Sequence, residues 1–163
     1  MVEKISFISN LPNSPAVYVM YGGRGRSSYV AYVGVTRVLK NRIIEHLIKR
    51  DRSVATGTTA VVLNPDFVTE LKWWECSEFS NWQFLQAAEL VAFDVFEPSL
   101  RSRGRIKKHA RQLYADPSFR KKMGELFTNE STGHLVILTL GDALARIDDL
   151  EQRIKELEKR LPK

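Results

Sequence analysis

Two apolar segments joined by a glycine-rich loop constrain the fold of this chain more than any other feature. Residues 16–21 (AVYVMY) and 29–35 (YVAYVGV) flank the loop GGRGRSS at residues 22–28. β-Branched and aromatic residues favour strands, and a short loop rich in glycine lets the chain reverse between them. The segment is therefore predicted to form a β-hairpin whose first strand is buried.

Three further elements are predicted after the hairpin. Apolar residues at every fourth position indicate a helix over residues 36–50, with Thr36 as its N-cap. Residues 67–74 (FVTELKWW) indicate a third strand, and residues 81–96 a strongly apolar helix. We expect an α/β (α+β) fold in which a small, mainly antiparallel three-stranded sheet is flanked by helices.

The C-terminal part carries a separate pattern. Apolar residues occupy the heptad a positions (Leu140, Ile147, Ile154 and Leu161) and the d positions (Ala143, Leu150 and Leu157). Isoleucine at a and leucine at d favour a parallel two-stranded coiled coil. Because three heptads are short for a free helix, we interpret residues 140–161 as a homodimer segment. Packing on its own domain and pairing with a foreign protein are the alternatives.

The chain divides at residue 134 in this interpretation. Residues 1–133 form the main domain, and residues 134–163 form the coiled-coil segment. Residues 134–140 (HLVILTL) are either a strand or the apolar lead-in to the helix.

Positive charge is concentrated in one part of the chain. The net charge is +6 and the pI about 9.5, but residues 101–122 alone carry +8 and the rest about −2. The nine basic residues are Arg101, Arg103, Arg105, Lys107, Lys108, Arg111, Arg120, Lys121 and Lys122. Such a patch favours a polyanionic partner, since each phosphate contact releases counterions. A solvated charged face is the alternative when the segment is taken alone.

Three charged or titratable residues are candidates for chemistry. Arg42 and His46 are four residues apart and so share one helix face, where they can bind a phosphate or move a proton. Glu89 lies in an apolar helix, and a buried carboxylate must be paired, protonated or bound to metal. The alternatives are a solvated face for the first two and a salt bridge for Glu89, to Arg42 or another cation.

These residues complete an ordered set that resembles the GIY-YIG nuclease signature. Pro15-Ala16-Val17-Tyr18 is similar to the first motif and Tyr32-Val33-Gly34 to the second. A Gly-x-Thr turn, a helix with Arg42, a helix with Glu89 and then Pro98 follow in the order that the family keeps. The resemblance covers roughly residues 12–101, and His46 is similar to a variant found in restriction enzymes of the superfamily.

The resemblance implies a metal-dependent DNA endonuclease that hydrolyses phosphodiester bonds. Tyr18, with Tyr32, would activate a water, Arg42 would offset charge on the phosphate, and His46 would assist. Glu89 would hold Mg²⁺ or Mn²⁺, a metal suited to one carboxylate together with waters and phosphate.

Nucleic acid is the partner that the resemblance implies, with RNA left open beside DNA. Gly34 would let the backbone approach the ligand. The basic side chains that would grip the nucleic acid are Arg101, Arg103, Arg105, Lys107, Lys108 and Arg111.

The chain departs from the family at Arg101, near the position where an Asn often supports the active site. The alternative function is therefore a non-catalytic nucleic-acid-binding module of the same fold, with the coiled coil as its partner handle. A purely structural coiled-coil adaptor is the third hypothesis.

The sequence does not support an intramolecular disulfide, a zinc site that uses cysteine, a signal peptide or a membrane segment. The single cysteine, Cys76, cannot form an intramolecular disulfide or a zinc site, which fits a reducing compartment. The N-terminus has no apolar signal-peptide core, and no stretch of about 18 apolar residues occurs. We expect a cytoplasmic protein without a membrane segment.

Overall fold

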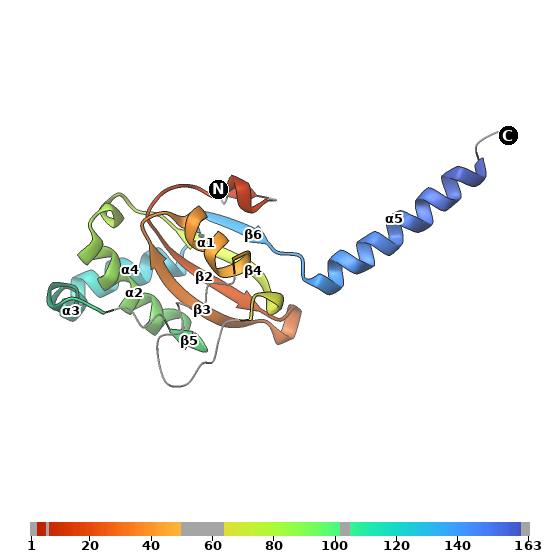
Figure 1. Cartoon of the computed structure of the whole chain (residues 1–163). Coiled ribbons are helices and arrows are strands. Elements are labelled where there is room, and N and C mark those ends of the chain that lie inside the picture. Colours follow the sequence, from red (N-terminus) through yellow and green to blue (C-terminus); the bar gives the residue numbers. More distant parts are fainter. Residues whose placement is uncertain (1–2, 6, 50–63, 102–104, 161–163) are drawn as a thin grey trace.

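The computed structural model describes residues 3–5, 7–49, 64–101 and 105–160, and it has an α+β fold (Figure 1). Six strands form one sheet: β1 (Glu3–Ile5), β2 (Ala16–Gly22), β3 (Tyr29–Thr36), β4 (Val68–Trp74), β5 (Leu100–Arg101) and β6 (Gly133–Val136). The α-helices within these ranges are α1 (Leu39–Leu47), α2 (Trp82–Phe96), α3 (Lys108–Ala115), α4 (Pro117–Thr128) and α5 (Leu140–Arg160). Short 3₁₀ turns occupy Ile8–Asn10, Gly25–Ser27, Pro65–Phe67 and Ser77–Ser80.

The strand order is β1-β6-β4-β2-β3-β5, so the three strands expected from the sequence are adjacent at the centre of the sheet. The hairpin β2–β3 is confirmed, and β2 also pairs antiparallel with β4. The prediction of a three-stranded sheet was wrong, because β1, β5 and β6 extend it and two of their pairings are parallel. β5 has only two residues and β1 three, too short for an alternating pattern to mark them.

β6 resolves the choice left open for residues 134–140. Gly133–Val136 pairs with β1 and β4 inside the sheet, and α5 begins only at Leu140. The sheet therefore includes residues on both sides of the division we drew at residue 134.

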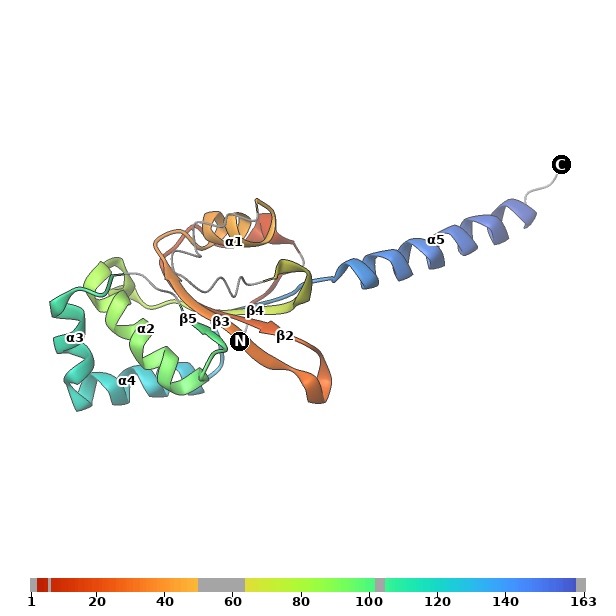
Figure 2. The same cartoon turned by 60° about the horizontal axis from the view of Figure 1, so that its bottom comes forward.

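Helices cover both faces of the sheet, as Figure 2 shows with α1 on one side and α2 and α4 on the other. Successive residues of β2 point to opposite faces. Val17 and Val19 pack in the apolar cluster with α2, whereas Tyr18 and Met20 pack in the cluster with α1. β2 is buried on both faces, which explains its nearly continuous apolar sequence.

The start of α1 differs from the expected cap. Val38, not Thr36, precedes the first turn of α1, and the Thr36 hydroxyl instead accepts the backbone N–H of Val38. At α2, the Asn81 side chain accepts the N–H groups of Gln83 and Phe84. Within the described ranges, none of the helices combines the length and apolar composition that a membrane span requires.

Candidate functional site

Two tyrosines lie side by side on the face of the sheet that α1 covers. Tyr18 of β2 is opposite Gly34 of β3, and Tyr32 is two residues before Gly34, so both phenols project from the same face. Their ring centroids are 6.0 Å apart. Both side chains are almost completely buried. The hairpin predicted from the sequence therefore brings the two motif tyrosines together, in the register that the structure gives.

Gly34 makes room for this pair. A Cβ atom at this position would lie 2.7 Å from the Tyr18 Oη and 2.7 Å from the Tyr32 Cε1. Real Cβ contacts are essentially never this short. The glycine is thus required by the two rings and not by an unusual backbone angle, which is a more specific reason than the close ligand approach we expected.

α1 places His46 and Arg42 above the tyrosines. The His46 Nε2 lies 2.8 Å from the Tyr18 Oη in a buried hydrogen bond. Its ring centroid is 5.9 Å from that of Tyr18 and 5.3 Å from that of Tyr32. Arg42, one turn earlier on the same face, forms an ion pair with Glu45 at 3.0 Å. Four of the five residues proposed for catalysis therefore lie in one cluster.

The cluster controls the charge state of Tyr18. Burial, and then the neighbouring Tyr32, raise the pKa of Tyr18 well above its usual 10, while the charge and hydrogen bonding of Arg42 oppose that rise. Burial alone would lower the pKa of Arg42, but Tyr18 and Glu45 beside it raise that pKa instead. At neutral pH the site thus holds a neutral phenol next to a permanent cation.

The hydrogen-bonding capacity of Tyr18 suits a proton relay. Arg42, whose charge opposes the rise in the pKa of Tyr18, has only donors, so the phenol oxygen can act toward it only as an acceptor. A phenol has one proton, and His46 Nε2 can take it when the imidazole carries its own proton on Nδ1. In that arrangement Tyr18 accepts from one side and donates to the other.

Glu89 lies on α2, which packs on the opposite face of the sheet from α1. It is 97% buried, as the apolar helix predicted. Along the helix it falls between Gln86, whose side-chain amide donates to the Arg105 carbonyl at 3.1 Å, and Phe93, whose ring faces the Arg101 guanidinium at 5.4 Å. Glu89 therefore belongs to the stripe of α2 that faces the chain around β5.

β5 is the edge strand of the sheet, beside β3, and lies between the tyrosines and this stripe of α2. Leu100 of β5 pairs with Tyr32 and packs in the cluster with Tyr18. Arg101 pairs with Val33, and its guanidinium lies over Phe93 on the α2 side. Glu89 and the tyrosines therefore lie on opposite faces of the sheet, and β5 contributes one residue to each face. Arg42, offered as a salt-bridge partner for Glu89, pairs with Glu45 instead.

The carboxylate of Glu89 is the part of the proposed site that suits a hard metal ion such as Mg²⁺. Glu89 offers oxygen ligands inside an apolar helix layer, where a carboxylate gains from a compensating cation. Among the described residues no group of three or more His, Cys, Asp or Glu side chains is arranged to hold a metal. A site there would be a single-carboxylate site completed by water and substrate oxygens, the type that Mg²⁺ tolerates.

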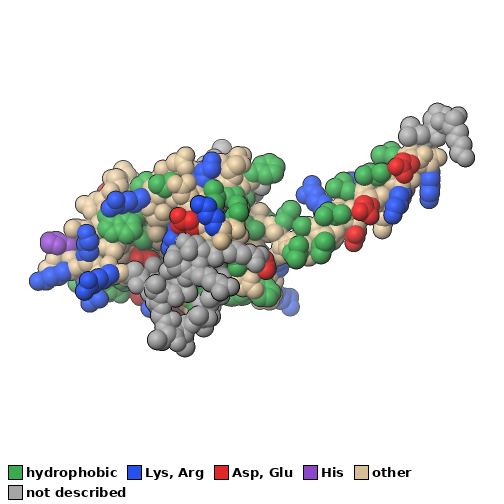
Figure 3. Space-filling view, in the orientation of Figure 1, with side chains coloured by type: hydrophobic (Ala, Val, Ile, Leu, Met, Phe, Trp, Pro, Cys, Tyr) green, Lys and Arg blue, Asp and Glu red, His purple; other side chains and the backbone are tan. Residues whose placement is uncertain are grey.

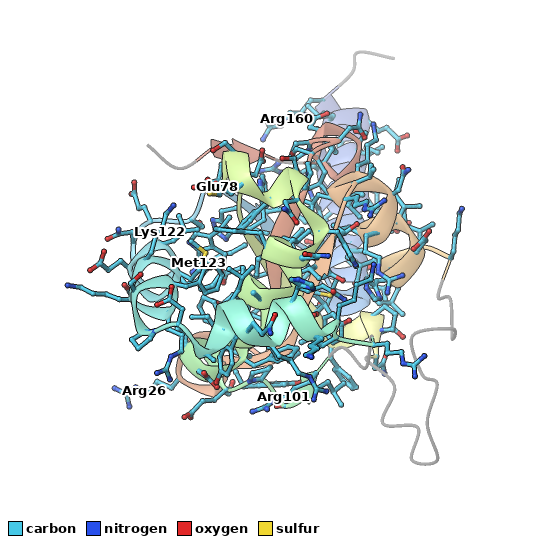
Figure 4. All side chains as sticks on the ribbon, turned by 90° about the vertical axis from the view of Figure 1, so that its left-hand side faces the viewer. Arg26, Glu78, Arg101, Lys122, Met123 and Arg160 are labelled. Atoms are coloured by element: carbon cyan, nitrogen blue, oxygen red, sulfur yellow. The ribbon has the colours of Figure 1, made fainter. Side chains whose placement is uncertain are left out.

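The basic side chains lie at the end of the molecule where α3 and α4 pack. Those of Arg101, Arg105, Lys107, Lys108 and Arg111 are exposed, and Arg103 lies outside the described residues. Figure 4 looks onto this end and shows Arg101 well apart from Lys122, which pairs with Glu78 at 2.6 Å. The charge is therefore spread over the exposed surface of this end of the molecule.

Glu45 is a member of the cluster that we did not anticipate. Its carboxylate holds the Arg42 guanidinium from three residues further along α1. The i, i+3 spacing of the two residues is a signal that would have found it.

A scan against models of known families, a search of curated proteins and a search of solved structures each find no significant match to this chain.

Proposed function

We propose that the protein is a metal-dependent endonuclease of the GIY-YIG type, acting on DNA. The observation that carries the proposal is the buried hydrogen bond between Tyr18 and His46, with Tyr32 and Arg42 beside it. Sequence resemblance supplied these residues as an ordered set, and an ordinary core tyrosine does not need a histidine, an arginine and a second phenol around its hydroxyl.

The proton leaves the attacking water through Tyr18 in this proposal. Because burial raises the pKa of Tyr18, free phenolate is scarce at neutral pH. The phenol oxygen instead takes the proton of the water while the phenol passes its own proton to His46 Nε2, 2.8 Å away. The water oxygen then forms a bond to phosphorus as the bond from phosphorus to the leaving oxygen breaks, and a solvent proton completes the leaving alcohol.

Arg42 and Glu89 supply charge of opposite sign. The Arg42 guanidinium, already fixed by Glu45, offsets the negative charge that develops on the phosphate oxygens. Glu89 is the residue that would hold Mg²⁺ or Mn²⁺, and when bound the metal supplies positive charge at the phosphate. The exposed basic side chains near α3 would contact the phosphate backbone around the site.

Nicking and linearisation of supercoiled plasmid tests the proposal. We expect cleavage by the wild type in Mg²⁺ or Mn²⁺, none in EDTA, and a loss of at least about 100-fold in the Tyr18→Phe variant. Tyr29→Phe is the matched control, because Tyr29 lies on the neighbouring strand β3 and its side chain is 47% exposed, outside the cluster. Cleavage that survives EDTA or Tyr18→Phe would refute the mechanism, and a parallel assay on structured RNA decides the substrate.

One observation favours a second candidate, a nucleic-acid-binding module without cleavage. The Arg101 guanidinium lies over Phe93, one helical turn from Glu89, so a permanent cation stands close to the proposed metal ligand. A cation there lowers the affinity of a divalent metal. We expect Arg101→Asn to lower the Mg²⁺ concentration needed for cleavage. If neither protein cleaves but both bind DNA in a salt-dependent way, the binding module is the correct function.

A further inference from the structure

Helix α5 presents an uncovered apolar face. It projects from the sheet as a single helix in Figure 1, and none of its 21 residues is buried. About half or more of the surface is exposed for each of its large apolar side chains, Leu140, Leu144, Ile147, Leu150, Ile154 and Leu157. Figure 3 shows these side chains as a row along the helix. A soluble chain rarely leaves such a row in water unless another surface covers it.

The base of α5 is fixed without covering this face. Asp142 accepts hydrogen bonds from the Thr139 backbone and hydroxyl, and it forms an ion pair with Arg24 of the β2–β3 connection. These contacts lower the pKa of Asp142, with the Thr139 hydrogen bond as the first cause. Asp142 is at the heptad c position, away from the apolar seam that the a and d positions form. Its contacts therefore set the direction of the helix and leave the a and d positions uncovered.

The charges beside the seam indicate which kind of helix can pair with α5. Each g position after Leu140 is basic (Arg146, Arg153 and Arg160), and the last two e positions are acidic (Glu151 and Glu158). In a parallel pair of identical helices, each g residue faces the e residue five positions later on the partner. Arg146 then meets Glu151 and Arg153 meets Glu158, twice over by symmetry. An antiparallel pair would set arginine against arginine and glutamate against glutamate.

We propose that α5 joins two copies of this chain in a parallel, in-register coiled coil held in register by these arginine–glutamate pairs. Within one chain Arg153 contacts Asp149 at 3.6 Å, an exposed contact that the dimer pair would replace or share. The apolar seam supplies the association, and the flanking charges supply the orientation. The inference does not depend on the proposed nuclease activity, because its test reads mass and not cleavage.

Sedimentation equilibrium of the full chain over a hundredfold concentration range is the primary measurement. The wild type is expected to dimerise reversibly. Arg146→Glu/Arg153→Glu turns four attractive contacts into repulsive ones and should raise the dimer Kd about 100-fold. Adding Glu151→Arg/Glu158→Arg to that variant reverses both signs and should restore the dimer. Lys155→Glu/Lys159→Glu is the matched control, since these lysines occupy the outer b and f positions.

A cysteine placed in the seam reports the orientation directly. Leu157→Cys in a Cys76→Ser background should form a covalent dimer under mild oxidation, because parallel d positions face each other. In an antiparallel pair centred on Leu150, the two cysteines would be about 21 Å apart along the axis. A monomer at every concentration, a larger oligomer, no effect of the arginine swap beyond that of the lysine control, or no cross-link would each overturn the proposal.

Discussion

Replacing Gly34 by alanine tests the packing that holds the tyrosine cluster together. The added methyl group would lie 2.7 Å from the Tyr18 Oη, 2.7 Å from the Tyr32 Cε1 and 2.8 Å from the Tyr18 Cζ, where ordinary contacts begin at 3.4 Å. Neither ring has room to swing away, since Tyr18 is fully buried and Tyr32 is 3% exposed. The strands or the rings must therefore shift by more than half an ångström.

The expected cost follows from this displacement. Inserting one methyl group into a packed core lowers the free energy of unfolding by about 1–3 kcal/mol, which for a chain of this length is a fall in Tm of roughly 2–10 °C. Moving Tyr18 also lengthens its 2.8 Å hydrogen bond to His46, so plasmid cleavage should fall by more than the loss of folded protein explains.

Urea unfolding followed by tryptophan fluorescence measures the stability change, and plasmid nicking measures the activity. Gly124→Ala is the matched control, because a Cβ there meets nothing within 4 Å and the residue lies in α4. A helical glycine replaced by alanine should stabilise by about 0.5–1 kcal/mol. If Gly34→Ala unfolds at the same urea concentration as the wild type and retains its activity, the steric argument for this glycine is wrong.

Three further predictions concern charge. Burial first, and then Tyr32, raise the pKa of Tyr18, so this phenol ionises at a lower pH in the unfolded chain than in the folded one. The free energy of unfolding should therefore fall as the pH rises above about 10. Urea titrations at several pH values measure this fall, and Tyr18→Phe should flatten it. Glu89→Gln should abolish both the rise in Tm that Mg²⁺ causes and the cleavage, while DNA affinity stays within about twofold of the wild type. Thermal scans at several Mg²⁺ concentrations measure the Tm, and filter binding measures the DNA affinity. Lys107→Ala/Lys108→Ala should reduce the slope of log K against log[salt] by about 2, whereas an equal slope would move the nucleic-acid contact away from α3.

The part of the site that was predicted from the sequence is the part that local geometry determines. Tyr32 and Gly34 are two residues apart in one strand, so they share a face, and a short hairpin brings Tyr18 opposite them. Arg42 and His46 are four residues apart in a helix that must cover that strand pair. Once the hairpin and the first helix are correct, the cluster follows with little freedom.

The position of Glu89 could not be predicted in the same way. Residues 85–89 of α2 are buried without interruption, so the apolar pattern has no polar side that tells which way the carboxylate points. The stripe it occupies is determined by the chain around β5, a two-residue strand whose pairing with β3 leaves no periodic signal. The same holds for β1, where three residues pair with β6 across more than a hundred positions of sequence.

The placement of α5 separates association from phosphate contact. α5 leaves the sheet after β6, whereas the exposed basic side chains gather at the far end of the molecule around α3 (Figures 1 and 3). A parallel pair through α5 would therefore leave the basic ends of both copies uncovered, each free to meet its own stretch of nucleic acid. Under the proposed function, breaking the pair should change the ratio of double-strand breaks to nicks, because two linked sites can cut both strands in one encounter. The rate of the first nick at saturating protein should stay the same, since no residue of α5 belongs to the cluster around Tyr18. A variant such as Arg146→Glu/Arg153→Glu that slowed that first nick would instead mean that α5 acts on the site itself.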